Sequence, residues 1–148
     1  MKVIARNKKA SFNYFLEEKF EAGIALKGTE IKSIRAGKVS IQDAYVRIKN
    51  TQAYIVNMHI AKYKEGNQFN HDETRTRKLL LHKKEIIKLH NALQLERKTI
   101  VATQVYIKEG LAKLEIAIGT GKKLHDKRHT LKTKDQNRRL EKIISKIF

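Results

Sequence analysis

Alternation of apolar and polar residues constrains the fold of this chain most strongly. Phe20, Ala22, Ile24 and Leu26 are separated by charged or small residues, and the same pattern recurs four times further along. A period of two places alternate side chains on one face of an extended strand. We therefore predict five half-buried strands. The residues expected to share one face of their strand are Phe20, Ala22, Ile24, Leu26; Ala44, Val46, Ile48; Tyr54, Val56, Met58, Ile60; Val101, Thr103, Val105, Ile107; and Leu114, Ile116, Ile118.

Two segments between these strands have a helical period instead. In "KGTEIKSIRAG", Thr29 is predicted to cap a short helix and Gly37 to end it. In "LLLHKKEIIKLHNALQLERK", Ile86, Leu89 and Leu93 are spaced to share one helix face. Residues 61–78 are polar and lack a period, so they are expected to form a loop. The strings "KNTQ" and "KEG" are expected to form turns.

The order of these elements indicates a mainly β (α+β) fold. Five strands with a helix between the third and fourth suit a small, closed, antiparallel barrel of the oligonucleotide-binding type, with two flanking helices. An open antiparallel sheet with helices on one face fits the same order. Residues 1–118 are predicted to form this body, and residues 119–148 a basic C-terminal tail.

The excess of positive charge indicates a polyanionic partner. The chain has 33 Lys and Arg against 15 Asp and Glu. Residues 1–118 carry 23 basic and 12 acidic side chains, a net of +11, and residues 119–148 carry 10 and 3, a net of +7. Body and tail are therefore both basic. Such a balance favours nucleic acid first and an anionic membrane second.

Several other classes of protein are disfavoured. The chain has no cysteine, so disulfides and thiol catalysis are excluded. No run approaches the roughly 18 apolar residues of a membrane span. The start, "MKVIARNKK", lacks the apolar stretch of a signal peptide. We expect a cytoplasmic monomer.

No catalytic, metal or cofactor site is expected. "IGTGKK" has Ile116 and Lys123 where a phosphate-binding loop needs Gly and Ser or Thr. His125 and His129 are four residues apart, but no third ligand joins them. Asp126 beside His125 is only a sequence neighbour, because no nucleophile accompanies the pair.

Two segments are candidates for RNA contact. In "ETRTRKLLL", Arg75 and Arg77 would point the same way in an extended chain and could bind adjacent phosphates. A solvated loop is the alternative. "ARNKKASFNYF" interleaves basic and aromatic residues, which suits base stacking. Burial of those rings in the core explains the pattern equally well.

The tail ends in an apolar stripe at helical spacing, formed by Leu140, Ile143, Ile144, Ile147 and Phe148. An isolated helix of this length is marginal, because packing of the stripe supplies most of its stability. We predict a tail that is disordered when free and helical when bound. A ribonucleoprotein groove, an anionic membrane and the body of this chain are all possible partners.

Three strings resemble one known family. "NKKASFNYFLEEKFEAGIALKGTEIKSIRAGKVSIQDAYV", "TRTRKLLL" and "GTGKKLHDKR" are similar to the bacterial SsrA-binding proteins, the small protein B family of trans-translation. The resemblance runs from about Ala5 to Arg139. It implies a non-enzymatic adaptor whose barrel binds the tRNA-like part of transfer-messenger RNA (tmRNA). It also implies rescue of stalled ribosomes, with the tail probing the decoding centre and the empty mRNA channel.

The resemblance also implies site residues. The RNA-binding residues would be Asn7, Lys8, Glu21 and Leu80, with Arg75, Arg77 and Lys78 as phosphate contacts. The ribosome-facing residues would be Gly121, Lys122, Lys123, His125, Asp126, Lys127 and Arg128. Glu73 and Thr76 stand where the family usually has proline, so this loop is expected to be less rigid than in relatives.

Two other hypotheses stay open. The tail could bind an anionic membrane surface as an amphipathic helix, although the chain has no Trp to anchor it. An RNA-processing enzyme would need an acid–base constellation that the sequence does not offer.

Overall fold

The structure, a computed structural model, describes residues 1–63 and 71–122. Its strands form a closed antiparallel barrel. In the main sheet β8 pairs with β4, and the pairing then runs through β5, β7, β2 and β9 and back to β8. Strand β1 adds to β8 outside this ring. The predicted barrel is therefore confirmed and the open sheet is wrong, because every strand of the ring is paired on both sides.

The described residues contain more strands than the five predicted. The barrel strands are β2 (Tyr14–Ile24), β4 (Tyr45–Lys49), β5 (Gln52–Val56), β7 (Arg77–Leu80), β8 (Thr99–Lys108) and β9 (Leu111–Gly121). The other strands are β1 (Lys2–Arg6), β3 (Val39–Ser40) and β6 (His59–Ile60). Residues 77 and 78 were expected in a loop. They form β7 because they pair with β5.

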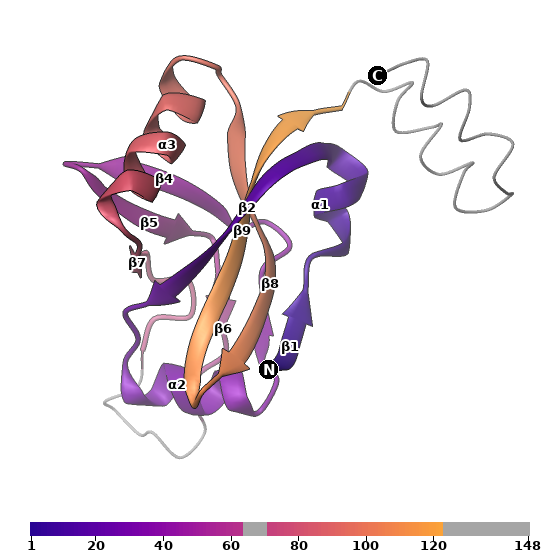
Figure 1. The fold of residues 1–148 in the computed structure, drawn as a ribbon. Helices are drawn as coiled ribbons and strands as arrows, with labels where there is room; N and C mark the ends of the chain where they lie inside the picture. Colours follow the sequence, from indigo (N-terminus) through magenta and orange to yellow (C-terminus); the bar gives the residue numbers. More distant parts are fainter. Residues whose placement is uncertain (64–70, 123–148) are drawn as a thin grey trace, which may run out of the picture.

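In the part of the chain that the structure describes, three helices surround the barrel where two were predicted. These are α1 (Lys8–Asn13), α2 (Gly28–Arg35) and α3 (Lys83–Gln94). Figure 1 shows α2 across one end of the barrel and α3 at the opposite end. The N-cap of α2 is Lys27 and not Thr29, whose hydroxyl instead bonds His71. Gly37 ends the helical segment as predicted, with φ of +80°.

The core fills the barrel with aliphatic side chains. Phe20, Ala22 and Ile24 from β2 are buried, and so are Leu114, Ile116 and Ile118 from β9. These faces were predicted correctly. Ile34 of α2 and Leu89 of α3 close the two ends and are fully buried.

The predicted face of two strands is partly wrong. In β5, Ala53 and Ile55 are fully buried, whereas Tyr54 and Val56 are only half-buried. The extended backbone is interrupted at Asn57, whose φ is +62°. The next side chain, Met58, therefore points into the core again. A register shift between Ala102 and Gln104 acts similarly in β8. One extra residue reverses which face is buried, so a strict period of two fails there.

Candidate nucleic-acid interface

The sites implied for Glu21, Lys78 and Leu80 lie together on the outside of the barrel. All three side chains line one hollow of about 490 Å³. Leu80 of β7 pairs with Gly23 of β2, which in turn pairs with Lys113 of β9. Glu21 is two residues along β2 from Gly23 and therefore projects from the same face. The topology thus gathers two carboxylates, Glu21 and Glu85, with the exposed Leu80 and two lysines in one open concavity.

Leu80 is an unusual element of this surface because it is 56% exposed although it lies in the middle of the sheet. Gly23 explains its position. A Cβ atom at Gly23 would lie 3.2 Å from the Leu80 Cβ, closer than ordinary van der Waals contact. Without that atom, the leucine packs directly against the β2 backbone. The result is a low apolar platform on an otherwise polar face.

Glu21 is held in place by a neighbouring strand. The Tyr106 hydroxyl donates to Glu21 Oε2 at 2.5 Å, and Lys108 Nζ lies 3.4 Å from the same oxygen. The hydrogen bond from Tyr106 and the charges of Lys108 and Lys113 lower the pKa of Glu21 below its ordinary value of 4.5. Partial burial opposes this shift without cancelling it. The carboxylate is therefore ionised and can only accept hydrogen bonds.

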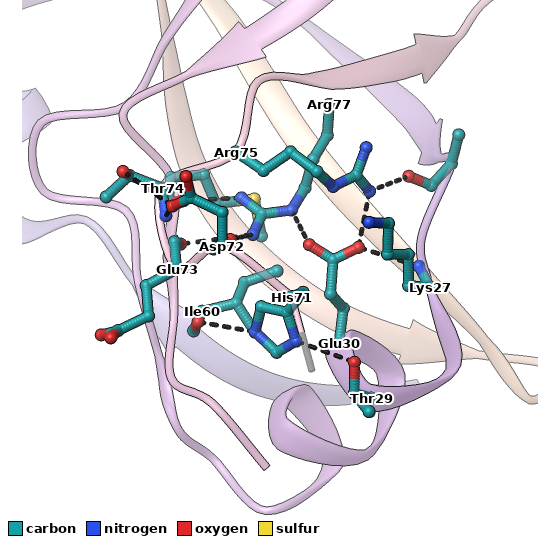
Figure 2. A network of polar contacts seen from close by, with 12 residues as sticks. Lys27, Thr29, Glu30, Ile60, His71, Asp72, Glu73, Thr74, Arg75 and Arg77 are labelled. Carbon is teal, nitrogen blue, oxygen red and sulfur yellow. Dashed lines mark hydrogen bonds and ion pairs between the residues drawn. The ribbon is translucent and has the colours of Figure 1, made fainter. Parts of the chain in front are cut away.

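Arg77 has a different environment from the one expected for a phosphate contact. Its side chain is 0% exposed and its Nε donates to Glu30 Oε2. Its other nitrogens donate to backbone carbonyls of Met58, Asp72 and Glu73. Figure 2 shows the guanidinium enclosed by these partners. The expected role of Arg77 as a phosphate contact does not fit this buried position, because its guanidinium nitrogens already donate to other groups of the protein.

The guanidinium of Arg75 also bonds other groups of the protein. Its guanidinium donates to Glu30 Oε1 at 2.6 Å and to the Ala25 carbonyl at 3.2 Å, and its side chain is 29% exposed. Arg75 and Arg77 do point the same way, as their spacing predicted, but they converge on Glu30 and not on solvent (Figure 2). Arg75 and Arg77 therefore match neither alternative from the sequence, a pair of phosphate contacts or a solvated loop.

Glu30 is the centre of this buried network. Burial by itself would raise its pKa, but hydrogen bonds from Arg75, the Lys27 amide and Arg77 outweigh burial and hold the pKa below 4.5. Nearby, His71 is 2% exposed, and its ring contacts the Thr29 hydroxyl and the Ile60 carbonyl. The network ties residues 71–77 to α2 and β6, so it fixes the start of β7 and the placement of Lys78 and Leu80 beyond it.

Asn7 is not in the hollow that contains Glu21. It is 8% exposed and caps α1, and its amide nitrogen donates to the carbonyls of Ile41 and Ala102. These bonds give Asn7 a structural role in joining α1 to the barrel. Lys8 is exposed at the first turn of α1. Its exposed ammonium group remains a predicted RNA contact.

The root of the tail lies beside α1. Gly121 ends β9, and the Lys122 amide donates to the Asn13 carbonyl. Lys122 Nζ reaches the Ser11 carbonyl at 2.9 Å and lies 4.9 Å from the centre of the Phe15 ring. The remaining predicted ribosome contacts, Lys123, His125, Asp126, Lys127 and Arg128, lie outside the described residues. The apolar stripe from Leu140 to Phe148 does so as well.

Sequence reasoning missed Lys113, which lines the hollow, and Tyr106, which bonds Glu21 from β8. Lys113 and Tyr106 belong to strands that were predicted, but nothing in a linear pattern indicates that β8 and β9 place them beside Glu21. The strand pairing supplies that information, because Tyr106 is the cross-strand partner of Lys113. In the described ranges, 1–63 and 71–122, no helix is both long and apolar enough to cross a membrane.

Comparisons with known proteins agree with the resemblance. A family model described as SmpB protein matches residues 4–146. The chain is 58% identical over 139 residues to the SsrA-binding protein of Oenococcus oeni, covering 94% of this chain and 90% of that protein. It is 54% identical over 143 residues to the SsrA-binding protein of Shouchella clausii, covering 97% and 92%.

A solved structure is also similar. A chain in the structure described as "tmRNA-SmpB: a journey to the center of the bacterial ribosome" matches with a TM-score of 0.69 and 41% identity, covering 84% of this chain and 87% of that one. Sequence and fold agree over nearly the whole length. The chain belongs to the SmpB family of SsrA-binding proteins.

Proposed function

We propose that this chain is a non-enzymatic adaptor that binds the tRNA-like domain of tmRNA and brings it to stalled ribosomes. The proposal is supported by membership of the SsrA-binding family and by the similar chain in a tmRNA–SmpB structure. The observation that carries it is the hollow lined by Glu21, Lys78, Leu80 and Lys113 on the barrel surface.

The hollow has the chemistry that folded RNA requires. RNA loops are recognised by stacking, backbone contacts and hydrogen bonds to exposed base edges. Lys78 and Lys113 supply positive charge for phosphates, Leu80 supplies an apolar surface, and Glu21 supplies a hydrogen-bond acceptor. In this proposal Arg75 and Arg77 position the edge of the site through Glu30, while Lys78 contacts phosphate.

The tail is assigned a separate task. We propose that residues 123–148 follow ribosomal RNA through the decoding centre into an empty mRNA channel. A net positive charge of +7 over residues 119–148 suits a polyanionic channel, and the sequence stripe from Leu140 to Phe148 suits a helix that forms on binding. Because an occupied channel would exclude it, the tail would distinguish stalled ribosomes from translating ones.

Deletion of residues 123–148 tests this division of labour. The deletion begins after Lys122, so it leaves every described strand and helix intact. Affinity for a transcript of the tRNA-like domain is expected to stay within about threefold of the full chain, while rescue of ribosomes on an mRNA without a stop codon is lost. Loss of most RNA affinity in the truncated chain would contradict the assignment of RNA binding to the barrel.

A further inference from the structure

A narrow cleft lies between α3 and the hairpin formed by β4 and β5 (Figure 1). Its volume is about 200 Å³, and its apolar lining comes from Ile48 of β4 and from Ile86 and Ile87 of α3. Ile87 is 51% exposed and lies outside the buried core. An exposed apolar cleft with polar residues around it is typical of a surface that contacts a partner.

The tip of the hairpin separates this cleft from a second hollow of different chemistry. Asn50 and Thr51 both have positive φ, 51° and 60°, as in the tight two-residue turns that join adjacent strands. Asn50 lines the cleft and also the second hollow, of about 350 Å³, which contains Arg47 and Lys49. These two cations alternate with Ile48 on β4, so they project from the other side of the hairpin. An apolar cleft and a cationic hollow therefore meet across one thin turn.

The cations around the turn are open to a ligand. Arg47, Lys49 and Lys83 are all exposed, and Lys83 lines the cleft itself. Within residues 1–63 and 71–122, none of the ion pairs involves these three side chains. Lys88 on the same helix differs, because it is paired with Glu18 at 2.6 Å. The rim of the cleft thus carries positive charge that an acidic ligand would complement.

This combination of an apolar lining and a cationic rim selects the kind of partner. The bases of RNA have polar edges, and the three isoleucines of the cleft offer those edges no hydrogen bonds, so their burial is unfavourable. A second copy of this chain and the chain's own tail are both basic and would be repelled by the rim. A large apolar side chain flanked by carboxylates matches both the lining and the rim.

We propose that the cleft between α3 and the β4–β5 hairpin docks an acidic, amphipathic segment of another protein. One large apolar side chain of that segment enters beside Ile87, and its carboxylates pair with Lys83 and, across the turn, with Arg47 and Lys49. The cleft shares no lining residue with the hollow that contains Glu21. The barrel therefore has room for a protein partner in addition to RNA, which goes beyond the proposed function.

Fluorescence anisotropy with the full chain tests the proposal. The probe is a fluorescein-labelled amphipathic peptide with leucines on one helix face and glutamates on the others. Saturable binding is expected. Peptides with lysine in place of glutamate, or alanine in place of leucine, should each bind at least about tenfold more weakly. Absence of saturable binding, or equal binding of the alanine peptide, would overturn the proposal.

Two variants test the apolar and the charged part of the site separately. Ile87→Gln is expected to weaken peptide binding about tenfold, the usual effect of losing a central apolar anchor. Its melting temperature should be unchanged, because the side chain is largely exposed. Arg47→Gln should weaken binding about threefold and reduce its dependence on salt.

Leu95→Gln and Arg6→Gln are the matched controls. Each removes an exposed side chain of the same kind outside the cleft and the adjoining hollow. Both should bind the peptide within about twofold of the wild type. Losses as large as those of Ile87→Gln and Arg47→Gln would show that the peptide responds to overall charge and surface, and not to the cleft.

Three measurements identify other occupants. Ile87→Gln should bind the tRNA-like RNA as the wild type does, whereas a loss of RNA affinity would assign the cleft to RNA. Deletion of residues 123–148 should not strengthen peptide binding, whereas a clear increase would identify the tail as the occupant. Sedimentation velocity should give the same species for Ile87→Gln and wild type, whereas a dimer lost in the variant would identify a second copy.

Discussion

Two glutamates, Glu30 and Glu21, differ in how many of their carboxylate oxygens are occupied. Glu30 accepts bonds from two arginines and a backbone amide, and Glu21 accepts bonds from Tyr106 and Lys108. Glu30 is 0% exposed, and both of its oxygens accept bonds from arginine. Glu21 is 41% exposed, and its two recorded partners share one oxygen. The first is a closed structural pair, and the second is an open acceptor at the edge of a hollow.

The difference shows why basic residues in one short segment have different roles. Arg77 and Lys78 are adjacent on β7, so their side chains project from opposite faces. Arg77 enters the interior and requires a partner, because an unpaired buried charge is very unfavourable. Lys78 stays in solvent and is available for RNA. Position relative to the sheet, and not charge, determines which of them can bind.

The largest expected effect comes from breaking the closed pair. Glu30→Gln should lower the free energy of unfolding by about 3 kcal/mol, because Arg77 is left buried without its counter-charge. Chemical denaturation measures it. Glu85→Gln is the matched control, since both glutamates accept the N-cap amide of a helix, from Lys27 and His82 respectively. Its cost should be about 1 kcal/mol or less. Equal losses in the two variants would show that the buried pair adds nothing beyond capping.

The same pair predicts a pH dependence of stability. The pKa of Glu30 is lower in the folded chain than its ordinary value of 4.5, so the unfolded chain binds the proton more readily. The stability from this group is complete above pH 4.5 and is lost as the pH falls through the lower, folded pKa. Denaturation curves between pH 6 and pH 3 measure it. Glu30→Gln should lose less stability than wild type over this window, and parallel curves would contradict the assignment.

The next effect concerns the platform of the hollow. Leu80→Glu should weaken binding of the tRNA-like RNA by tenfold or more, about 1.4 kcal/mol, because it adds a further negative charge to the hollow where RNA approaches. Stability should change by less than about 0.5 kcal/mol, because the side chain is exposed. Leu95→Glu serves as control: Leu95 is 77% exposed after α3 and outside the hollow. A comparable loss of affinity at both positions would mean that the effect is one of net charge only.

The smallest effect separates two cations that sequence reasoning treated alike. Lys78→Ala should lower the slope of log affinity against log salt by about one unit, the change expected when one phosphate contact is lost. Arg75→Ala should leave that slope unchanged, because Arg75 donates to Glu30 and Ala25 and not to RNA. The slopes are measured by RNA binding at several salt concentrations. The reverse result would place Arg75, and not Lys78, on the phosphate.

The fold was predictable where local patterns decide it. The alternation in residues 20–26 and 114–118, and the helical period around Leu89, correctly identified buried faces and the barrel. The turn at "KEG" also forms, with Glu109 and Gly110 at positive φ. The pattern failed where the strand is interrupted, by the positive φ of Asn57 after β5 and by the register shift between Ala102 and Gln104 in β8. Such irregularities depend on pairing with distant strands.

The candidate site was predictable only in part. The resemblance implies one set that contains Glu21, Lys78 and Leu80, and the structure brings these three residues to one hollow. It could not separate Arg77 from Lys78, because burial of Arg77 depends on Glu30, 47 residues away in sequence. Asn7 was similarly included, although its amide bonds carbonyls of distant segments. Long-range hydrogen bonding, invisible in a linear pattern, assigns these two residues to the structure and not to the surface.

Photo-crosslinking from position 80 tests the central claim most directly. A benzophenone amino acid replaces Leu80 in one full-length variant and Leu95 in another, and each is irradiated with the tRNA-like domain of tmRNA. The account predicts efficient crosslinking from position 80, competed by unlabelled RNA, and little from position 95. Crosslinking from position 95 with none from position 80 would contradict the claim that the hollow between β2, β7 and β9 is the RNA-binding face.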